Sequence, residues 1–519
     1  MEKSGKSGSG KPNKKKEGPG GKDILRRGFI ILFWLCVWQL AAVITHNDIL
    51  LVGPVRVAGA LFQHMKEADF LRIIFYSSAR IGLGFFAALV CGVLLGASAC
   101  RYAWLEEFFA PVMAVLKSVP VASFVVLLLI WSGSGSLSFF ISFLIVFPNV
   151  YVNTTAGLKS TDKKLLEMSR VLGMSGRNRI WFLYRPALMP YLRSSLKISL
   201  GMSWKSGVAA EVIGMPAYSL GERIYLSKIY LDTAGLFAWT LMVILLSFLF
   251  EKAVLYLLKR LEDWKPYPAV ERRAERWRKW EKRQWNRTGK GKGLTERRKK
   301  KRQEAEVTPP EIAIRNVCKA YGKQQVLSDF SMTMRPGGRY CLMAPSGAGK
   351  TTLLSLLNRT VLPDAGTIEG APERIGMVFQ EDRLCGEYDV AANILLTYRP
   401  DAGYKRGASE RNRVAGAEER AIGFVRAEAA KILPAECLTK AVNKLSGGMK
   451  RRCAILRAMF SGAELIVMDE PFAGLDEENR ERTAAYILEN LNGRTLLVTT
   501  HRAEDAELLD GKIVTLKEE

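Results

Sequence analysis

The chain has 519 residues, 48% of them hydrophobic, and a formal net charge of +25. This length is too great for one ordinary domain. Apolar runs of about 20 residues, long enough to cross a bilayer, stop near residue 257, and a soluble α/β pattern begins near residue 310. The eight cysteines have no paired spacing, which argues against a disulfide framework or a cysteine metal site.

Much of the positive charge lies in two blocks, residues 11–22 and 271–302. Both lie next to apolar runs, as positive-inside signals do, so topology and anionic lipid account for them better than nucleic acid. We expect membrane lipid as a partner and no nucleic acid. Residues 1–28 are predicted to be a disordered, basic cytoplasmic tail that is retained rather than cleaved.

Residues 29–257 predict an all-α polytopic membrane domain of about six transmembrane helices. The fifth candidate is the weakest by hydropathy. With a cytoplasmic N-terminus, the even count returns the C-terminus to the cytoplasm and makes the basic loop of about 157–189 cytoplasmic too. The candidate spans are 29–45, 73–99, 108–131, 137–156, 190–213 and 235–257.

Within that loop, Leu165, Met168 and Leu172 follow helical spacing, and Gly173 is a plausible stop. A second short helix is expected from Arg179 to Tyr184, before Pro186. Residues 258–308 are predicted to be a basic charged linker. Its tryptophans at helical spacing suit a membrane interface, and a solvated helical spacer is the alternative.

Residues 309–519 contain a glycine loop between the predicted strand "RYCLMA" and a helix. Such a loop cradles phosphates, because small residues let backbone N–H groups close around them and the helix N-terminus adds positive dipole. Lys350 would bridge the β and γ phosphates, and Thr351 would bind Mg²⁺. Ala344 replaces the usual first glycine. The predicted phosphate-binding residues are Ser346, Gly347, Ala348, Gly349, Lys350, Thr351 and Thr352.

The apolar strand "LIVMDEP" at 465–471 ends in two acids. Asp469 would hold Mg²⁺ indirectly, and Glu470 would polarise the attacking water. Together with "LSGGMKRRCAILRAMF", "VFQED" and "TTH", these motifs resemble the ATPase domain of ATP-binding cassette (ABC) transporters over residues 311–519. The resemblance implies an α/β P-loop NTPase domain of the ABC type that uses ATP and Mg²⁺.

The resemblance also implies roles for residues outside the phosphate loop. Ser446, Gly447 and Gly448 would contact ATP bound to the other subunit, again with amides at a helix N-terminus. Tyr321 would stack on adenine, and Gln380 would sense the γ phosphate and Mg²⁺. Asp476 would lie across the dimer interface, and His501 would brace the γ phosphate.

The loop at 157–189 resembles the cytoplasmic loop of binding-protein-dependent importer permeases, with Glu167, Gly173 and Pro186 or Pro190 matching. That likeness implies docking on the ATPase near Gln380. Residues 30–257 look like permeases of the nitrate, sulfonate and taurine branch. Among the charges inside predicted spans, Lys205 either faces the solute path and favours an anion, or the charges form a structural pair, such as Arg80 with Glu211.

The whole chain is therefore identified as a permease fused to its ATPase. We expect ATP-driven import of a small anionic solute by a homodimer that works with an extracytoplasmic solute-binding protein. It would lie in the cell membrane, multi-pass, with the N-terminus and the ATPase cytoplasmic. The alternatives are an ABC exporter half-transporter and a non-transport ABC ATPase that regulates a cell-surface partner. Short cytoplasmic connections argue against the first, and short outer loops against the second.

Overall fold

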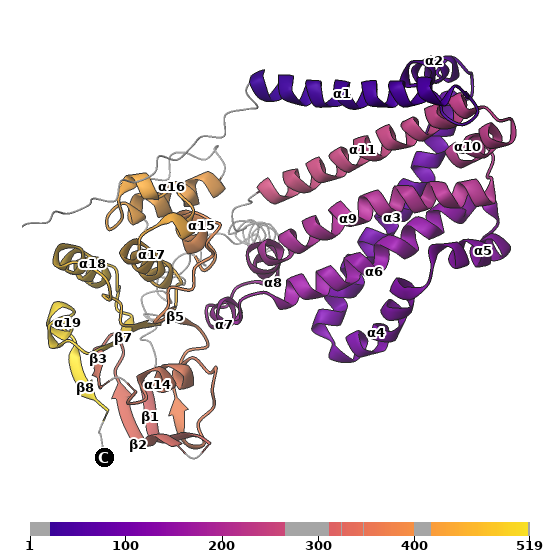
Figure 1. Cartoon of the computed structure of the whole chain (residues 1–519). Coiled ribbons are helices and arrows are strands. Elements are labelled where there is room, and N and C mark those ends of the chain that lie inside the picture. The colour runs from indigo at the N-terminus through magenta and orange to yellow at the C-terminus, as the bar shows by residue number, and fades with distance from the viewer. Residues whose placement is uncertain (1–20, 265–310, 323, 346, 399–416, 517–519) are drawn as a thin grey trace, which may run out of the picture. The chain divides into compact units, whose positions relative to one another are not determined.

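The computed structural model describes residues 21–264, 311–322, 324–345, 347–398 and 417–516 (Figure 1). By contacts the chain divides into two compact units. One comprises Met1–Ala156 and Tyr191–Arg260, and the other comprises Gly157–Pro190 and Leu261–Glu519. The predicted basic tail up to residue 20, most of the predicted linker, and Ser346 lie outside the described residues.

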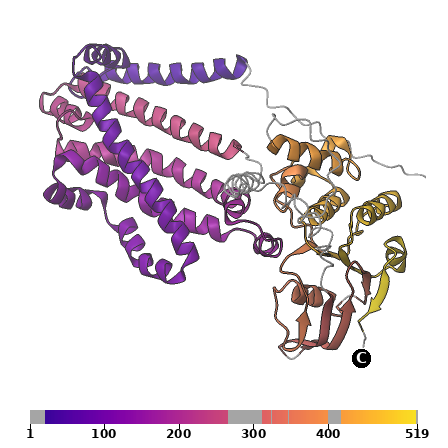
Figure 2. The ribbon, with the colours of Figure 1, turned by 180° about the vertical axis from the view of Figure 1, so that it is seen from behind.

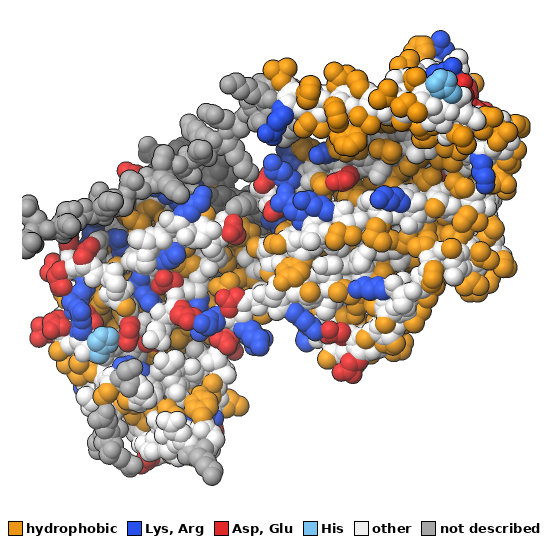
Figure 3. Space-filling model, viewed as in Figure 1, with side chains coloured by type: hydrophobic (Ala, Val, Ile, Leu, Met, Phe, Trp, Pro, Cys, Tyr) orange, Lys and Arg blue, Asp and Glu red, His pale blue; other side chains and the backbone are white. Residues whose placement is uncertain are grey.

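The described part of the first unit consists of helices (Figures 1 and 2). Large apolar side chains lie on its surface, as in the helix α1, where Phe29 is 70% and Trp34 64% exposed. Figure 3 shows hydrophobic side chains across much of its visible face. Such a surface suits lipid rather than water. The helices are α1 Gly21–Thr45, α2 Pro54–His64, α3 Phe70–Arg101, α4 Ala103–Ser118, α5 Val121–Ser132, η1 Ser134–Ser136, α6 Leu137–Lys159, α9 Arg185–Gly214, α10 Leu220–Ile229 and α11 Thr233–Asp263.

Four of the described helical stretches are long and apolar enough to cross a membrane: Gly28–Thr45, Phe70–Arg101, Ser134–Lys159 and Thr233–Asp263. The helix α9, predicted as the weak fifth span, is 30 residues long but does not reach that apolarity. The predicted span 108–131 is not one straight helix, because α4 and α5 meet at a bend of 103°. Pro120 explains the break: Val119 before it is extended, with ψ 131°.

A buried carboxylate joins three helices of this unit. Glu211 of α9 accepts hydrogen bonds from Ser77 Oγ at 2.8 Å and from Ser138 Oγ at 3.1 Å. The backbone N–H of Gly221 donates to it at 3.3 Å. Among the described residues no carboxylate lies within 4.0 Å of Arg80, so Arg80 and Glu211 form no direct ion pair, although the charge of Arg80 acts on Glu211 from a greater distance. Hydroxyls and a backbone amide, rather than a cation, satisfy this acid.

The second unit contains two sheets. A five-stranded sheet of order β5-β6-β7-β3-β8 is parallel throughout, and a three-stranded antiparallel sheet has the order β2-β1-β4. The two strands "LIVMD" and "TLLVTT" are buried along their whole length and lie inside the parallel sheet. Such strands are covered on both faces and are therefore mostly apolar. The strands are β1 Ile312–Tyr321, β2 Gln324–Met334, β3 Arg339–Met343, β4 Ala365–Glu369, β5 Ile375–Val378, β6 Leu465–Asp469, β7 Thr495–Thr500 and β8 Lys512–Thr515.

Helices complete this unit around the sheets (Figures 1 and 2). Residues of α15, α16 and α17 share one hydrophobic cluster, which contains Ile394, Val425 and Cys453. The predicted fold class, an all-α membrane-type part followed by an α/β part with a phosphate loop, is confirmed. The helices are α14 Lys350–Leu357, α15 Val390–Leu395, α16 Ala417–Ala429, η3 Ala435–Cys437, η4 Val442–Lys444, α17 Gly447–Met459, α18 Glu477–Glu489 and α19 Ala503–Leu508.

The loop segment 157–190 belongs to the second unit and begins with the helix α7 Lys163–Val171. The predicted stop is confirmed, since Gly173 follows with φ +63°, a conformation that favours glycine. The predicted end before Pro186 is wrong. The chain runs from α8 Gly176–Arg179 through a π-helical turn, Ile180–Tyr184, directly into α9. Proline is tolerated in the first turn of a helix, where an N–H donor is not required.

Candidate nucleotide site and its docked loop

The register of the parallel sheet brings the predicted site residues to one edge. Met343 pairs with Thr500, Asp469 with Thr499, and Val378 with Met468. The phosphate loop, Gln380, Glu470 and His501 each follow directly after one of these strand ends. Ligands of parallel α/β sheets bind at this carboxyl edge.

The phosphate loop has the backbone that its glycines predict. Gly347 and Gly349 have φ +90° and +93°, so a side chain there would be strained. A Cβ on Gly349 would also lie 2.9 Å from the carbonyl of Val326. The Lys350 ammonium donates to the carbonyl of Ala344 at 2.5 Å. The loop therefore holds a buried cation at the start of α14, where Thr351 and Thr352 occupy the first turn.

Two acids and a histidine lie at the ends of β6 and β7. Asp469 is buried and accepts a hydrogen bond from Thr499 Oγ1 at 2.5 Å. Burial raises the pKa of the Asp469 carboxyl, and the Thr499 hydrogen bond lowers it by less. Glu470 has φ +48° and its N–H donates to the carbonyl of Thr499 at 3.1 Å. This places its Oε1 3.4 Å from His501 Nδ1.

Arginines of α17 hold the segment after β5. Arg451 donates to the carbonyls of Phe379 at 2.6 Å and Gln380 at 2.5 Å, and its Nε lies 3.3 Å from Asp382 Oδ1. Arg457 is fully buried and donates to the carbonyl of Arg383 at 2.6 Å. Burial raises the pKa of the Asp382 carboxyl although Arg451 is near. The backbone of residues 379–383 is therefore held by hydrogen bonds to α17, the helix that begins next to Ser446.

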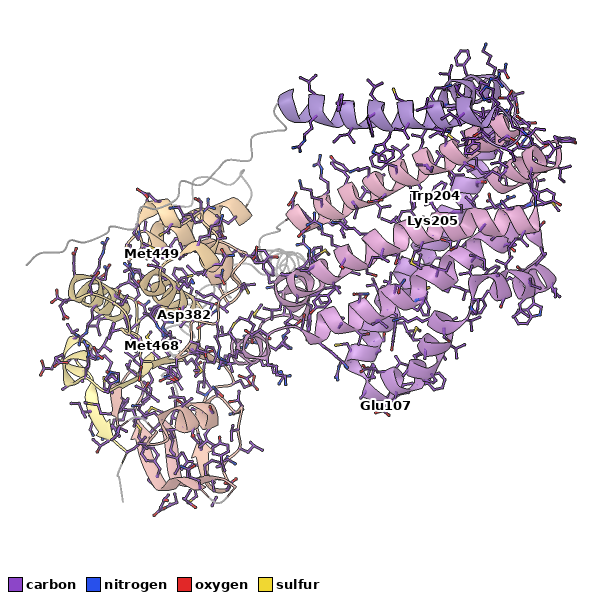
Figure 4. The ribbon with its side chains drawn as sticks, in the orientation of Figure 1. Glu107, Trp204, Lys205, Asp382, Met449 and Met468 are labelled. Atoms are coloured by element: carbon purple, nitrogen blue, oxygen red, sulfur yellow. The ribbon has the colours of Figure 1, made fainter. Side chains whose placement is uncertain are left out.

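The predicted cross-subunit residues form a hollow of their own. Ser446 caps α17, and Asp476 caps α18 by accepting from the N–H of Asn479 at 2.9 Å, which lowers the pKa of its carboxyl. Arg452 donates to Asn479 Oδ1 at 2.5 Å and so links the two helices. The residues around this hollow include Asp382 and Asn479 but no described residue of the phosphate loop. Figure 4 labels Asp382, which lines this hollow, and Met449, the residue after Gly448 in α17.

Tyr321 ends β1 with its ring 51% exposed, and Lys319 Nζ lies 5.8 Å from the ring centre. The ring is accessible for stacking, and its role stays a prediction. Ser346 is the one predicted nucleotide-site residue outside the described part of the chain.

The loop segment 157–190 is packed on the same segment after β5. Arg383 Nη1 lies 3.1 Å from Glu167 Oε2, and Lys164 Nζ lies 2.6 Å from Glu381 Oε1. Met168 is fully buried in the cluster that contains Phe379 and Met377 of this unit. The predicted docking near Gln380 is thus present in the structure.

The π-helical turn makes a second contact. The Tyr388 hydroxyl donates to the carbonyl of Trp181 at 3.1 Å, and its ring centre lies 4.6 Å from that of Phe182. Burial raises the pKa of the Tyr388 hydroxyl, which keeps it a donor. Arg185 donates to the carbonyls of Leu261 and Glu262 at the end of α11.

Sequence reasoning missed Arg451, Arg457, Arg383 and Tyr388. The basic run "KRRCAILR" after Ser446 was visible, but it gives no sign of which carbonyls its arginines contact. These partners lie about 70 residues away in the chain.

Comparisons with known proteins agree with this geometry. The family model "ABC transporter" matches residues 327–473, and the model "Binding-protein-dependent transport system inner membrane component" matches residues 88–263. The chain is 35% identical over 223 residues to the Nod factor export ATP-binding protein I of Burkholderia orbicola (strain AU 1054), covering 40% of this chain and 68% of that protein. The chain belongs to the ABC transporter family. It joins a membrane part of the binding-protein-dependent type to a cassette that hydrolyses ATP.

Two further proteins each match 40% of this chain. The phosphonates import ATP-binding protein PhnC of Anaeromyxobacter dehalogenans (strain 2CP-C) is 33% identical over 224 residues, covering 40% of this chain and 44% of that protein. The dimeric bacterial ABC transporter cassette MJ0796 is 25% identical, with a TM-score of 0.34, and the match covers 40% of this chain and 94% of that one.

Proposed function

We propose that this ABC transporter imports a small anionic solute of the nitrate, sulfonate or taurine kind, delivered by an extracytoplasmic binding protein. The observation that carries the proposal is the docking of Glu167 and Lys164 on Arg383 and Glu381. The family model that matches residues 88–263 is a binding-protein-dependent one, which supports import over export.

The nucleotide site supports a defined division of labour. Lys350 and the amides of Gly347 to Thr352 hold the phosphates, and Glu470 polarises the attacking water. His501, whose Nδ1 lies 3.4 Å from Glu470 Oε1, braces the γ phosphate. Tyr321 stacks on adenine. The oxygen donors of Thr351, Gln380 and Asp469 are of the hard type that Mg²⁺ prefers, partly through water. Bound Mg²⁺ would neutralise charge on the phosphates.

Two copies of the chain are needed in this scheme. The hollow lined by Ser446, Gly447, Gly448 and Asp476 contains none of the phosphate-loop residues that the structure describes, which supports a site completed by a second copy rather than by one chain. A second copy would supply the N-terminus of its α17, whose amides and dipole suit phosphate. Closure of the two cassettes would pull on the segment 379–383 through Arg451 and move the docked loop segment.

The proposed topology is that of a multi-pass protein of the cell membrane, with the N-terminus, the loop segment 157–190 and the cassette in the cytoplasm. The basic runs that flank the apolar helices support it. The predicted domain limits, 29–257 for the permease and 309–519 for the cassette, are part of the same proposal.

The direction of transport can be tested in proteoliposomes that have cassettes on the outer side. The binding protein that co-purifies with the chain is identified, and its ligand is determined by mass spectrometry. Vesicles are loaded with both, the same concentration of ligand is present outside, and ATP is added outside. An importer releases the ligand towards the cassette side, whereas accumulation in the lumen would show an exporter. No ATP-dependent movement in either direction would contradict transport.

A further inference from the structure

Lys205 lies in the C-terminal part of α9, the predicted fifth span, on a side that its own protomer leaves uncovered. Its side chain is exposed, and Figure 4 labels it on α9 next to Trp204. Ile198, Met202 and Ala209 are exposed too and share this face of α9 at helical spacing. Among the described residues it has neither a hydrogen-bond nor an ion-pair partner. A Cβ built on Gly201, on the same side, would meet nothing within 4 Å. The face therefore has both a free cation and space beside it.

The opposite face of α9 is tightly packed, so the helix is not peripheral. Trp204 is 1% exposed and shares a core cluster with Ile81 of α3. A Cβ on Gly207 would lie only 2.7 Å from Ile81. Glu211 is buried on this side with its three hydrogen bonds satisfied. The exposed stripe is thus one defined side of a central helix.

Lipid is a poor neighbour for this side. Lys205 lies nine residues before the end of α9 at Gly214, about 13 Å along the axis at 1.5 Å per residue. That depth exceeds the reach of a lysine side chain. An ammonium there requires water or an opposite charge.

The charge at this level of the membrane part is positive in excess. The Ile81–Gly207 contact sets Arg80 at a depth close to that of Lys205. Arg80 Nη1 is buried and has no hydrogen-bond acceptor, while the guanidinium lies 5.6 Å from the ring centre of Tyr76. Glu211 is the one carboxylate among the described residues of α3 and α9. It already accepts hydrogen bonds from the hydroxyls of Ser77 and Ser138. A second anion is therefore electrostatically favoured beside Lys205.

We propose that Lys205 is an anion-binding residue of the solute path, whose ammonium donates hydrogen bonds to the oxygens of a small oxyanion such as nitrate or an alkylsulfonate. This inference rests on the proposed function, because it assigns a contact for the solute of the same transporter. It also names the charge class of that solute from the membrane part alone.

A charge series tests the contact in the full chain, reconstituted with its binding protein, with nitrate and ethanesulfonate as probes. Lys205→Gln is expected to lower probe transport by about tenfold or more, the effect of about 1.4 kcal/mol, while ATP hydrolysis continues. Lys205→Arg keeps the charge and is expected to retain most transport. The matched control is Lys197→Gln. Lys197 lies on the same helix but about 80° around its axis from Lys205, at 100° per residue, and its substitution is expected to leave transport unchanged. Equal transport by Lys205→Gln and the wild type would overturn the inference.

A second measurement does not depend on transport. Cys36 and Cys91 are replaced by Ser, Lys205→Cys is introduced, and vesicles are treated with a membrane-impermeant thiosulfonate. Labelling of position 205 in at least one nucleotide state is expected, whereas Cys36 of α1 in an otherwise unchanged chain stays unlabelled. If the wild type transports neither nitrate nor ethanesulfonate, the proposed solute class is wrong. The labelling experiment then still shows whether position 205 faces water. Absence of labelling with and without ATP would overturn the inference by itself.

Discussion

At the scale of single residues, Glu470 owes its position to an unusual backbone conformation. Its φ of +48° and the hydrogen bond from its N–H to the Thr499 carbonyl turn the side chain towards His501. Strain of this kind persists where the surroundings hold a residue in place, and it often accompanies function. The carboxylate is therefore fixed at the strand edge where nucleotide binds.

We expect Glu470→Gln to bind ATP but hydrolyse it about 10² to 10⁴ times more slowly, because a neutral amide cannot accept the proton of water. Phosphate release and binding of a fluorescent ATP analogue measure the two steps. Glu478→Gln, an exposed neighbour on α18, is the control and is expected to have normal turnover. Normal hydrolysis by Glu470→Gln would remove this residue from the proposed mechanism.

Asp469 illustrates how function and stability oppose each other at one residue. Burial raises the pKa of its carboxyl, so in the folded state the charged form is disfavoured, and ionisation at higher pH lowers the free energy of unfolding. We expect Asp469→Asn to stop hydrolysis yet raise the thermal stability of the nucleotide-free protein. The gain should shrink as pH falls through the raised pKa, because the wild type then becomes neutral too. Thermal melts across pH measure this, and a gain that grows towards acid pH would contradict it.

At the scale of elements, two ion pairs between the loop segment and the segment after β5 differ in burial. Arg383 is 20% exposed and also lies 4.3 Å from the ring centre of Phe379, whereas Lys164 and Glu381 are each more than half exposed. Exposed pairs contribute little because water screens them. The Arg383–Glu167 pair is therefore the one expected to matter for coupling.

Charge reversal tests that pair. Arg383→Glu or Glu167→Arg alone is expected to lower transport per ATP a few-fold, in line with a pair worth about 1 kcal/mol, and the double reversal is expected to restore it. Reversal of Lys164 and Glu381 is the matched comparison, with a smaller effect. Uptake and phosphate release are measured on the same vesicles. Single and double variants with equal coupling would show that the contact is incidental.

Sequence patterns predicted the elements well where the signal was local. Apolar runs predicted the strands β3 and β6, and glycines predicted the phosphate loop and the stop at Gly173. The expected helix end before Pro186 was wrong, because a π-helical turn carries the chain into α9. The third span, predicted at 108–131, is divided into α4 and α5 by a bend of 103° at Pro120, which its hydropathy did not indicate. The contacts of Arg451 depend on tertiary packing between distant segments, which no local pattern records.

At the scale of the whole molecule, the fusion of membrane part and cassette has a consequence for assembly. Every chain brings its own docked loop segment, so two identical chains would contain both membrane halves and both cassettes. The oligomer would then be closed by twofold symmetry, the commonest arrangement for two copies. Each nucleotide site would use Lys350 of one chain and Ser446 of the other.

Mixed dimers test this shared site directly. A chain with Lys350→Ala and a chain with Ser446→Arg should each be inactive alone, because every site then lacks one of its two parts. When the two are co-assembled and purified through different tags, one site combines the intact Lys350 with the intact Ser446, and hydrolysis should return. The control places both substitutions in one chain and pairs it with the wild type. Both sites are then damaged, although the number of substitutions is the same. If each chain completed its own site, the outcome would be reversed: the control would be active through its wild-type chain and the first mixture would be inactive. That result would mean that the shared-site arrangement has to be abandoned.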